Sequence, residues 1–267
     1  MHRTAGNTTV AISKVGSNRQ QNRKDMRAKA IITVIILAAA TLAAAQKARK
    51  TTAQAMAAQG LVDIAVKDPT IHVSLMYARA DNFTGRILYG DLKQAFLHPL
   101  AADALVKAQR RLKQLRPDLS LKVYDAARPM SIQQKMWDAV KNTGHSFYVS
   151  NPKNGGGLHN YGLAVDITLC RENGDTIPMG TKVDNMTAIS HIDNEEQLLR
   201  QKMITREAYD NRRLLREVMR SAGWKPLRTE WWHFNLRTRA QAKKYFKVVK
   251  PLPQAPRKPL PASPKGR

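Results

Sequence analysis

The sequence has little cysteine and little acid. Only one of its 267 residues is cysteine, Cys170, so no disulfide can form within the chain and a site built from several thiolates is excluded. Asp and Glu number 20 against 45 Lys and Arg, a formal net charge of +25. Positive charge attracts nucleic acid, anionic lipid and anionic cell-wall polymer alike. Because the chain lacks the basic-aromatic motifs that read bases, we expect no nucleic-acid partner.

Long hydrophobic runs are also missing, since no apolar stretch reaches the ~20 residues that a membrane-spanning helix needs. The longest, residues 30–45, reads AIITVIILAAATLAAA and follows Arg27 and Lys29. A basic segment, a short apolar segment and small residues are typical of a secretory signal peptide. Within a signal region of residues 1–45, we expect 1–25 to be an over-extended start and 26–45 the signal peptide. Cleavage near Ala45–Gln46 would export the protein to the periplasm; an uncleaved anchor or a buried helix is the alternative.

Glycine and proline are too few for a collagen-like or wholly disordered chain, at 14 and 13 residues. Six of the prolines lie between basic residues after Lys250. Proline has no amide hydrogen and fixes φ, so residues 247–267 are predicted to form a disordered basic tail. We expect at most weak contact of this tail with anionic envelope polymer. Residues 46–60 are interpreted as a linker, and residues 61–246, without internal repeats, as one domain.

Hydrophobic periodicity predicts mixed secondary structure in this domain. Apolar residues recur at helical spacing in residues 101–115 and 206–222. Pro129 suits the first turn of a further helix over residues 130–142, and residues 238–246 are predicted as a terminal helix. Strands are predicted at residues 119–125, 163–169 and 230–234. Helices and strands do not alternate in a strict βαβ order, which favours an α+β fold over a doubly wound sheet. We expect a single compact domain with a small, antiparallel-rich sheet packed by helices.

Two short clusters carry ionisable groups in apolar settings: residues 157–166 contain His159 and Asp166, and residues 229–234 contain Glu230 and His233. Two imidazoles and one carboxylate suit Zn²⁺ with one position open for water, and the second carboxylate could then act as a general base. His159 and Asp166 are seven residues apart, which puts them on opposite faces of a strand or about two turns apart along a helix, so the chain must turn near Gly162 to bring them together. Spacing alone leaves a metal site and a pair of hydrogen-bonded core histidines as open alternatives.

Four segments in this order resemble the zinc-dependent D-alanyl-D-alanine dipeptidases, the VanX-like branch of the D-Ala-D-Ala metallopeptidase superfamily. The segments are Tyr77–Gly85, Asp125–Pro129, His159–Asp166 and Glu230–His233, and the likeness extends from Leu61 to Phe246. The resemblance implies one zinc ion in a central cleft, held by His159, Asp166 and His233. It also implies that Glu230 is the general acid/base and that Arg128 stabilises the transition state.

The function implied by the resemblance is hydrolysis of the dipeptide D-Ala-D-Ala to two D-alanines, in cell-wall peptide turnover or glycopeptide resistance. Two alternatives are a D,D-carboxypeptidase or endopeptidase that acts on peptidoglycan stem peptides, and a non-catalytic cell-wall-binding protein. One departure concerns substrate affinity: the family commonly has serine two residues before the first histidine, where this chain has Gly157. Neither the residues nor the resemblance indicates an oligomeric state.

Overall fold

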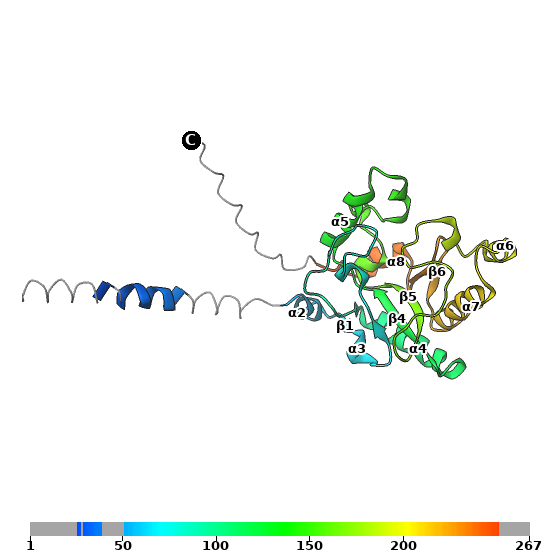
Figure 1. Cartoon of the computed structure of the whole chain (residues 1–267), viewed down its shortest axis with the longest axis horizontal. Coiled ribbons are helices and arrows are strands. Elements are labelled where there is room, and N and C mark those ends of the chain that lie inside the picture. Colours follow the sequence, from blue (N-terminus) through cyan, green and yellow to red (C-terminus); the bar gives the residue numbers. More distant parts are fainter. Residues whose placement is uncertain (1–25, 28, 39–50, 251–267) are drawn as a thin grey trace, which may run out of the picture. The chain divides into compact units, whose positions relative to one another are not determined.

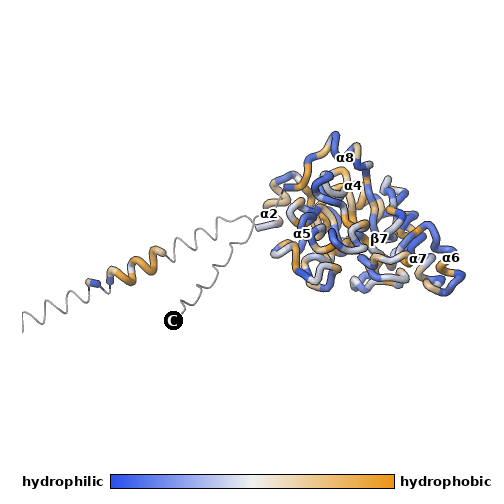
Figure 2. Tube along the Cα trace, turned by 90° about the horizontal axis from the view of Figure 1, so that it is seen from above, coloured by the Kyte–Doolittle hydropathy of each residue, from blue (hydrophilic) through white to orange (hydrophobic). Residues whose placement is uncertain are grey.

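The computed structural model describes residues 26–27, 29–38 and 51–250, and it divides the chain into two units, residues 1–50 and residues 51–267 (Figure 1). In the first unit the described residues are helical, and Figure 2 shows the apolar character of residues 31–38. Among the residues that the structure describes, no helix has the length and apolar character needed to cross a membrane. Residues 39–50, which include the predicted cleavage site, lie outside the described residues, so the signal peptide stays a prediction.

A five-stranded sheet forms the centre of the second unit, with the strand order β2-β4-β5-β7-β6. Strands β2 and β4 pair in parallel and the other three pairings are antiparallel, which confirms the predicted α+β fold with an antiparallel-rich sheet. The central strand β5 is buried along all but its last residue, because other elements cover both faces of the sheet. The strands are β2 (His72–Val73), β4 (Leu119–Asp125), β5 (Ala164–Arg171), β7 (Glu230–Asn235) and β6 (Lys225–Leu227).

A second, two-stranded sheet pairs β1 (Val62–Asp63) with β3 (Phe96–Leu97). Neither of these short strands was predicted, because two residues are too few to show an alternating pattern. Short 3₁₀ helices occupy several of the loops between strands and helices: η1 (Met76–Ala78), η2 (Gly144–Tyr148), η3 (Pro152–Asn154), η4 (Leu158–Tyr161) and η5 (Ala188–Ser190).

The four predicted helices are present with ends shifted by one or two residues: α4 (Pro99–Leu115), α5 (Met130–Val140), α7 (Arg206–Ser221) and α8 (Arg239–Tyr245). Helix α4 packs against both α7 and β4, so its apolar stripe faces the sheet. The side chain of Thr205 accepts a hydrogen bond from the amide of Ala208 and caps the start of α7. Gly223, with φ +89°, follows the end of α7 as expected for a helix stop. Three shorter helices are α2 (Thr52–Ala57), α3 (Ile64–Lys67) and α6 (Glu195–Arg200).

Two predicted boundaries differ from the structure. Part of the segment interpreted as a linker, residues 46–60, forms helix α2, whose Met56 is fully buried in the main core. At the other end, Val249 is also buried in this core, and its amide donates to the carbonyl of Asn160 at 2.7 Å. Residues 247–250 of the predicted disordered tail therefore belong to the folded unit, and residues 251–267 lie outside the described residues.

Gly162 makes the turn that the spacing of His159 and Asp166 requires. It ends helix η4 with φ +65°, a left-handed conformation that only glycine adopts without strain. Its carbonyl accepts a hydrogen bond from the amide of His98 at 3.0 Å, and a β-carbon at this position would lie 2.8 Å from that same amide nitrogen. The turn therefore depends on glycine for both its conformation and its packing, and it leads the chain directly into β5.

We predict that Gly162→Ala lowers the free energy of unfolding by about 3 kcal/mol, because left-handed strain adds to overpacking against His98. Gly90→Ala is the matched control, since Gly90 has φ +60° but open space around its would-be β-carbon; it should cost only about 1–2 kcal/mol. Urea unfolding followed by circular dichroism measures both values. Equal losses in the two variants would show that the close approach at Gly162 has no energetic consequence.

Candidate functional site

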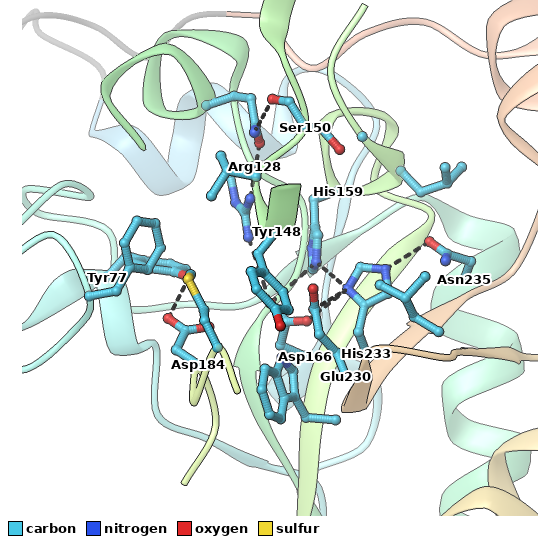
Figure 3. Close-up of a pocket in the computed structure, with 18 of the residues that line it drawn as sticks. Tyr77, Arg128, Tyr148, Ser150, His159, Asp166, Asp184, Glu230, His233 and Asn235 are labelled. Atoms are coloured by element: carbon cyan, nitrogen blue, oxygen red, sulfur yellow. Dashed lines mark hydrogen bonds and ion pairs between the residues drawn. The ribbon is translucent and has the colours of Figure 1, made fainter. Parts of the chain in front are cut away.

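The five residues predicted to form the site meet in one pocket (Figure 3). Asp166 in β5 lies directly opposite His233 in β7, because these two antiparallel strands pair in that register. His159 comes from η4, just before the Gly162 turn, and Glu230 is the first residue of β7. Arg128 follows the end of β4, so three adjacent strands and the turn before β5 supply the whole set.

His159, Asp166 and His233 each present one ligand atom to a common point, and these atoms all lie within 4.8 Å of one another. His159 Nε2 is 3.3 Å from Asp166 Oδ2, and His233 Nδ1 is 2.9 Å from Asp166 Oδ1. The two ring nitrogens are themselves 3.3 Å apart. Two nitrogens and one oxygen thus converge, as expected for a metal site with mixed N and O ligands.

In each ring one nitrogen faces the common point and the other, the outer nitrogen, faces away from it. The hydrogen bonds of the outer nitrogens distinguish a metal site from a pair of hydrogen-bonded core histidines. His159 Nδ1 donates to the carbonyl of Ala126 at 2.7 Å, and His233 Nε2 donates to Asn235 Oδ1 at 3.0 Å. With these protons assigned, both inner nitrogens carry lone pairs. Burial raises the pKa of Asp166, whereas positive charge on His159 and His233 holds that pKa well below its usual range. A metal cation at the same point would supply this positive charge in place of the ring protons and keep Asp166 ionised.

Two lone pairs and a carboxylate facing one point repel one another unless a cation lies among them. The outer hydrogen bonds of the histidines are the arrangement that orients imidazole ligands in metal sites. Satisfied core histidines would instead donate to, and accept from, different neighbours. The donor set therefore fits a divalent metal ion better than a pair of hydrogen-bonded core histidines.

Glu230 lies beside the ligand set without belonging to it. Its Oε2 is 3.9 Å from His233 Nδ1, and its side chain lines the pocket. Burial raises the pKa of Glu230 to about 8; the positive charge that His233 can carry opposes this shift, and the carboxylates of Asp166 and Asp184 add to it. A cation bound to the three ligands would lower this pKa. A carboxyl group that can hold or release a proton near neutral pH fits the role of general acid/base.

Arg128 is a fixed, buried cation in the pocket wall. Its Nε donates to Asp125 Oδ2 at 2.8 Å, and its Nη1 donates to Gln133 Oε1 at 2.9 Å. Its Nη2 is 3.6 Å from Asp166 Oδ2, and the ring of Tyr77 lies 5.3 Å from the guanidinium carbon. The guanidinium is thus held in place before any substrate binds, which is the condition for stabilising charge in a transition state.

Several residues of the pocket were not predicted. Asp184, which has φ +62°, accepts a hydrogen bond from the hydroxyl of Tyr77 at 2.7 Å. Burial and the charge of Asp166 raise the pKa of Asp184 to about 7, against the effects of Tyr77 and Arg128. Tyr148 and Ser150 enter from the loop after α5. These residues lie in irregular segments, where no periodicity indicates which side chains face the site.

Comparisons with known proteins agree with this geometry. The peptidase family model described as "D-ala-D-ala dipeptidase" matches residues 56–251. The D-alanyl-D-alanine dipeptidase of Escherichia coli (strain K12) is 35% identical over 176 residues, which cover 66% of this chain and 84% of that protein. The enzyme of that name from Synechocystis sp. (strain ATCC 27184 / PCC 6803 / Kazusa) is 29% identical over 161 residues, with 49% and 65% covered. That from Enterococcus faecium is 35% identical over 89 residues, with 33% and 41% covered.

Asn235→Leu should weaken metal binding about 10- to 100-fold. Asn235 accepts the hydrogen bond that keeps a proton on His233 Nε2 and thereby leaves Nδ1 available to the metal, and the variant loses this acceptor. Competition with a chromophoric chelator measures the affinity. Asn142→Leu, an exposed asparagine outside the pocket, is the control and should bind metal as tightly as the unmodified protein. Undiminished affinity in Asn235→Leu would contradict the proton assignment at His233.

Proposed function

The chain belongs to the D-Ala-D-Ala dipeptidase family and is thus a metallopeptidase, and from this membership and the pocket we propose that it is a zinc dipeptidase that hydrolyses D-Ala-D-Ala to two D-alanines. The observation that carries the proposal is the meeting of His159, Asp166 and His233 with Glu230 and Arg128 in one pocket. Ligands, acid/base group and fixed cation are the complete set needed for metal-assisted peptide hydrolysis.

Zinc is the metal that we propose for the three ligands. Two imidazole nitrogens and one carboxylate oxygen, with a further position open, are typical of catalytic zinc sites. When bound, zinc would polarise the scissile carbonyl and lower the pKa of a water molecule. The hydrogen bonds of His159 to Ala126 and of His233 to Asn235 keep both rings oriented toward this ion.

Glu230 and Arg128 then have separate tasks. Glu230 takes a proton from the water that attacks the scissile carbonyl carbon. As the carbon–nitrogen bond breaks, Glu230 gives this proton to the nitrogen of the leaving D-alanine, so that the side chain returns to its starting state. Arg128 donates hydrogen bonds to the carbonyl oxygen as it gains negative charge, and its anchor on Asp125 means that little reorganisation is needed.

The size of the pocket supports a dipeptide as substrate. Its volume is about 230 Å³, below the ~300–1,000 Å³ of pockets that hold drug-sized ligands. The hydroxyl of Tyr148, which lines the pocket, lies 3.3 Å from His191 Nε2, so two loops far apart in the sequence meet beside it. The carboxylate of Asp184 offers a partner for a free ammonium group, which a dipeptide has next to its scissile bond and a long stem peptide has not.

We also propose that the protein works outside the cytoplasmic membrane, on peptides derived from the cell wall. Support for this comes from the basic and apolar pattern of residues 26–45, which is typical of a signal peptide. N-terminal sequencing of the protein from its own cells, after separation of cytosol, membrane and exported protein, tests the proposal. A mature chain that begins near Gln46 agrees with it, and a cytosolic chain that retains residues 30–45 contradicts it.

The purified protein, loaded with zinc, is expected to release D-alanine from D-Ala-D-Ala with a kcat/KM at least tenfold higher than from a pentapeptide that ends in D-Ala-D-Ala, because the small pocket and Asp184 select a short substrate with a free amino group. A D-alanine release assay compares the two substrates. Protein treated with a chelator serves as the control. Preferential cleavage of the pentapeptide would instead favour a carboxypeptidase, and salt-sensitive wall binding without any hydrolysis would favour a non-catalytic protein.

Glu230→Ala should keep its zinc but lose turnover by about 10²–10⁴-fold, because only the proton transfer is removed. His233→Ala should lose both zinc and turnover. Metal analysis of the purified variants, together with the D-alanine assay, separates these outcomes. Glu207→Ala, which removes an exposed carboxylate on α7, is the control and should keep both. Near-normal rates in Glu230→Ala would show that another group moves the proton.

A further inference from the structure

Gly157 lines the pocket beside the side chain of Ser150, and its backbone conformation does not require glycine. Its φ of −109° is open to any residue. A β-carbon built at this position would lie 2.8 Å from the hydroxyl oxygen of Ser150 and 3.3 Å from the β-carbon of Ser150. Real β-carbons do not approach other atoms as closely as 2.8 Å. A side chain at position 157 would therefore force the Ser150 hydroxyl to rotate away from the place that it holds here.

Ser150 is held at this place by the same network that holds Arg128. Its main-chain carbonyl accepts a hydrogen bond from Gln133 Nε2 at 2.7 Å, and the other end of the Gln133 amide accepts from Arg128. The Ser150 side chain lines the pocket and is drawn there in Figure 3. Among the described residues no hydrogen-bond partner is found for the Ser150 hydroxyl, although its carbonyl is fixed. The Ser150 hydroxyl is thus presented to the pocket and can donate a hydrogen bond to a bound molecule.

The charged groups of the pocket indicate which end of a dipeptide Ser150 would meet. Asp184, the partner for an ammonium group, lies beside Tyr77, apart from Ser150 (Figure 3). The loop that carries Gly157 is tied instead to α8, where Arg239 Nη2 donates to the carbonyl of Asn154 at 2.8 Å. Arg239 also lines the pocket. A zwitterionic dipeptide with its ammonium at Asp184 would therefore direct its carboxylate toward Ser150 and Arg239.

We propose that the Ser150 hydroxyl donates a hydrogen bond to the carboxylate of the dipeptide, and so supplies from the loop before η3 the hydroxyl that position 157 lacks. The proposal rests on the function proposed above and adds a substrate-binding residue to it. The two positions share one volume, so a side chain at position 157 would displace the Ser150 hydroxyl from the place that it holds here.

Ser150→Ala is expected to raise KM for D-Ala-D-Ala about tenfold with kcat changed by less than about twofold, because a hydrogen bond to a charged group is lost on binding. Ser146→Ala, in the same loop but outside the pocket lining, is the control and should leave both constants unchanged. A KM for Ser150→Ala equal to that of the unmodified protein would overturn the proposal, and so would a fall in kcat alone.

The exchange of the two residues tests the shared volume. Gly157→Ser alone should raise KM at least as much as Ser150→Ala, because the new side chain displaces the Ser150 hydroxyl from its place at the pocket. The double variant Ser150→Gly/Gly157→Ser should return KM to within about threefold of the unmodified protein, since one hydroxyl again faces the pocket. Thermal unfolding confirms that each variant is folded. A double variant that stays as weak as Ser150→Ala would show that the two positions do not substitute for each other.

Calorimetry provides a readout that does not need turnover. D-Ala-D-Ala and its C-terminal amide are titrated into zinc-loaded Glu230→Gln, with and without Ser150→Ala. The dissociation constant for D-Ala-D-Ala should rise about tenfold, and that for the amide, which lacks the charged carboxylate, by less than about threefold. Equal losses for both ligands would overturn the carboxylate assignment. If the unmodified protein hydrolyses D-Ala-D-Ala but the Ser150 variants behave normally, only the Ser150 proposal fails; absence of hydrolysis in the unmodified protein contradicts the proposed function itself.

Discussion

The buried carboxylate of Asp166, shared between two imidazole rings, is the constraint on which the site depends. An ionised carboxylate and two lone pairs around one point are unfavourable in a buried position without a cation. The register of β5 against β7 sets Asp166 opposite His233, and the Gly162 turn brings His159 to the same point. The sheet and the turn thus hold the ligands in place without contributions from flexible surface loops, which preorganises the site for a metal ion.

A second buried network surrounds Arg128 and links the site to the rest of the fold. Asp125 at the end of β4 accepts hydrogen bonds from Arg128 and from the hydroxyl of Tyr89, so a fully buried carboxylate is paired with both a charge and a neutral donor. Through Gln133 in α5 the same guanidinium fixes the main chain at Ser150. One ion pair therefore positions both the Arg128 guanidinium and a wall of the pocket. Loss of either partner would leave an unpaired buried charge, which is far more costly than loss of a surface ion pair.

The parts of this arrangement that could be predicted from sequence are those with a regular pattern. Helices α4 and α7 were predicted from apolar residues at helical spacing, and the turn at Gly162 from the mismatch between His159 and Asp166. Helix α2 and the segment around Val249 lie in stretches that the sequence predicts as a linker and a disordered tail, because each enters the core through very few residues, such as Met56. Asp184 and Ser150 could not have been placed, since contacts between distant loops set their positions and loops carry no periodic signal.

The mixture of charges in the pocket bears on the choice among the three functions considered. The chain as a whole is strongly basic. A protein that only binds anionic polymer needs a binding groove lined by positive charge. The pocket instead contains carboxylates at Asp184 and Glu230 as well as guanidinium groups at Arg128 and Arg239. Opposite charges at separate places in a small cavity are complementary to a zwitterion, which carries one charge of each sign. A free dipeptide satisfies both ends at once, whereas a longer stem peptide would leave the carboxylate of Asp184 without its ammonium partner.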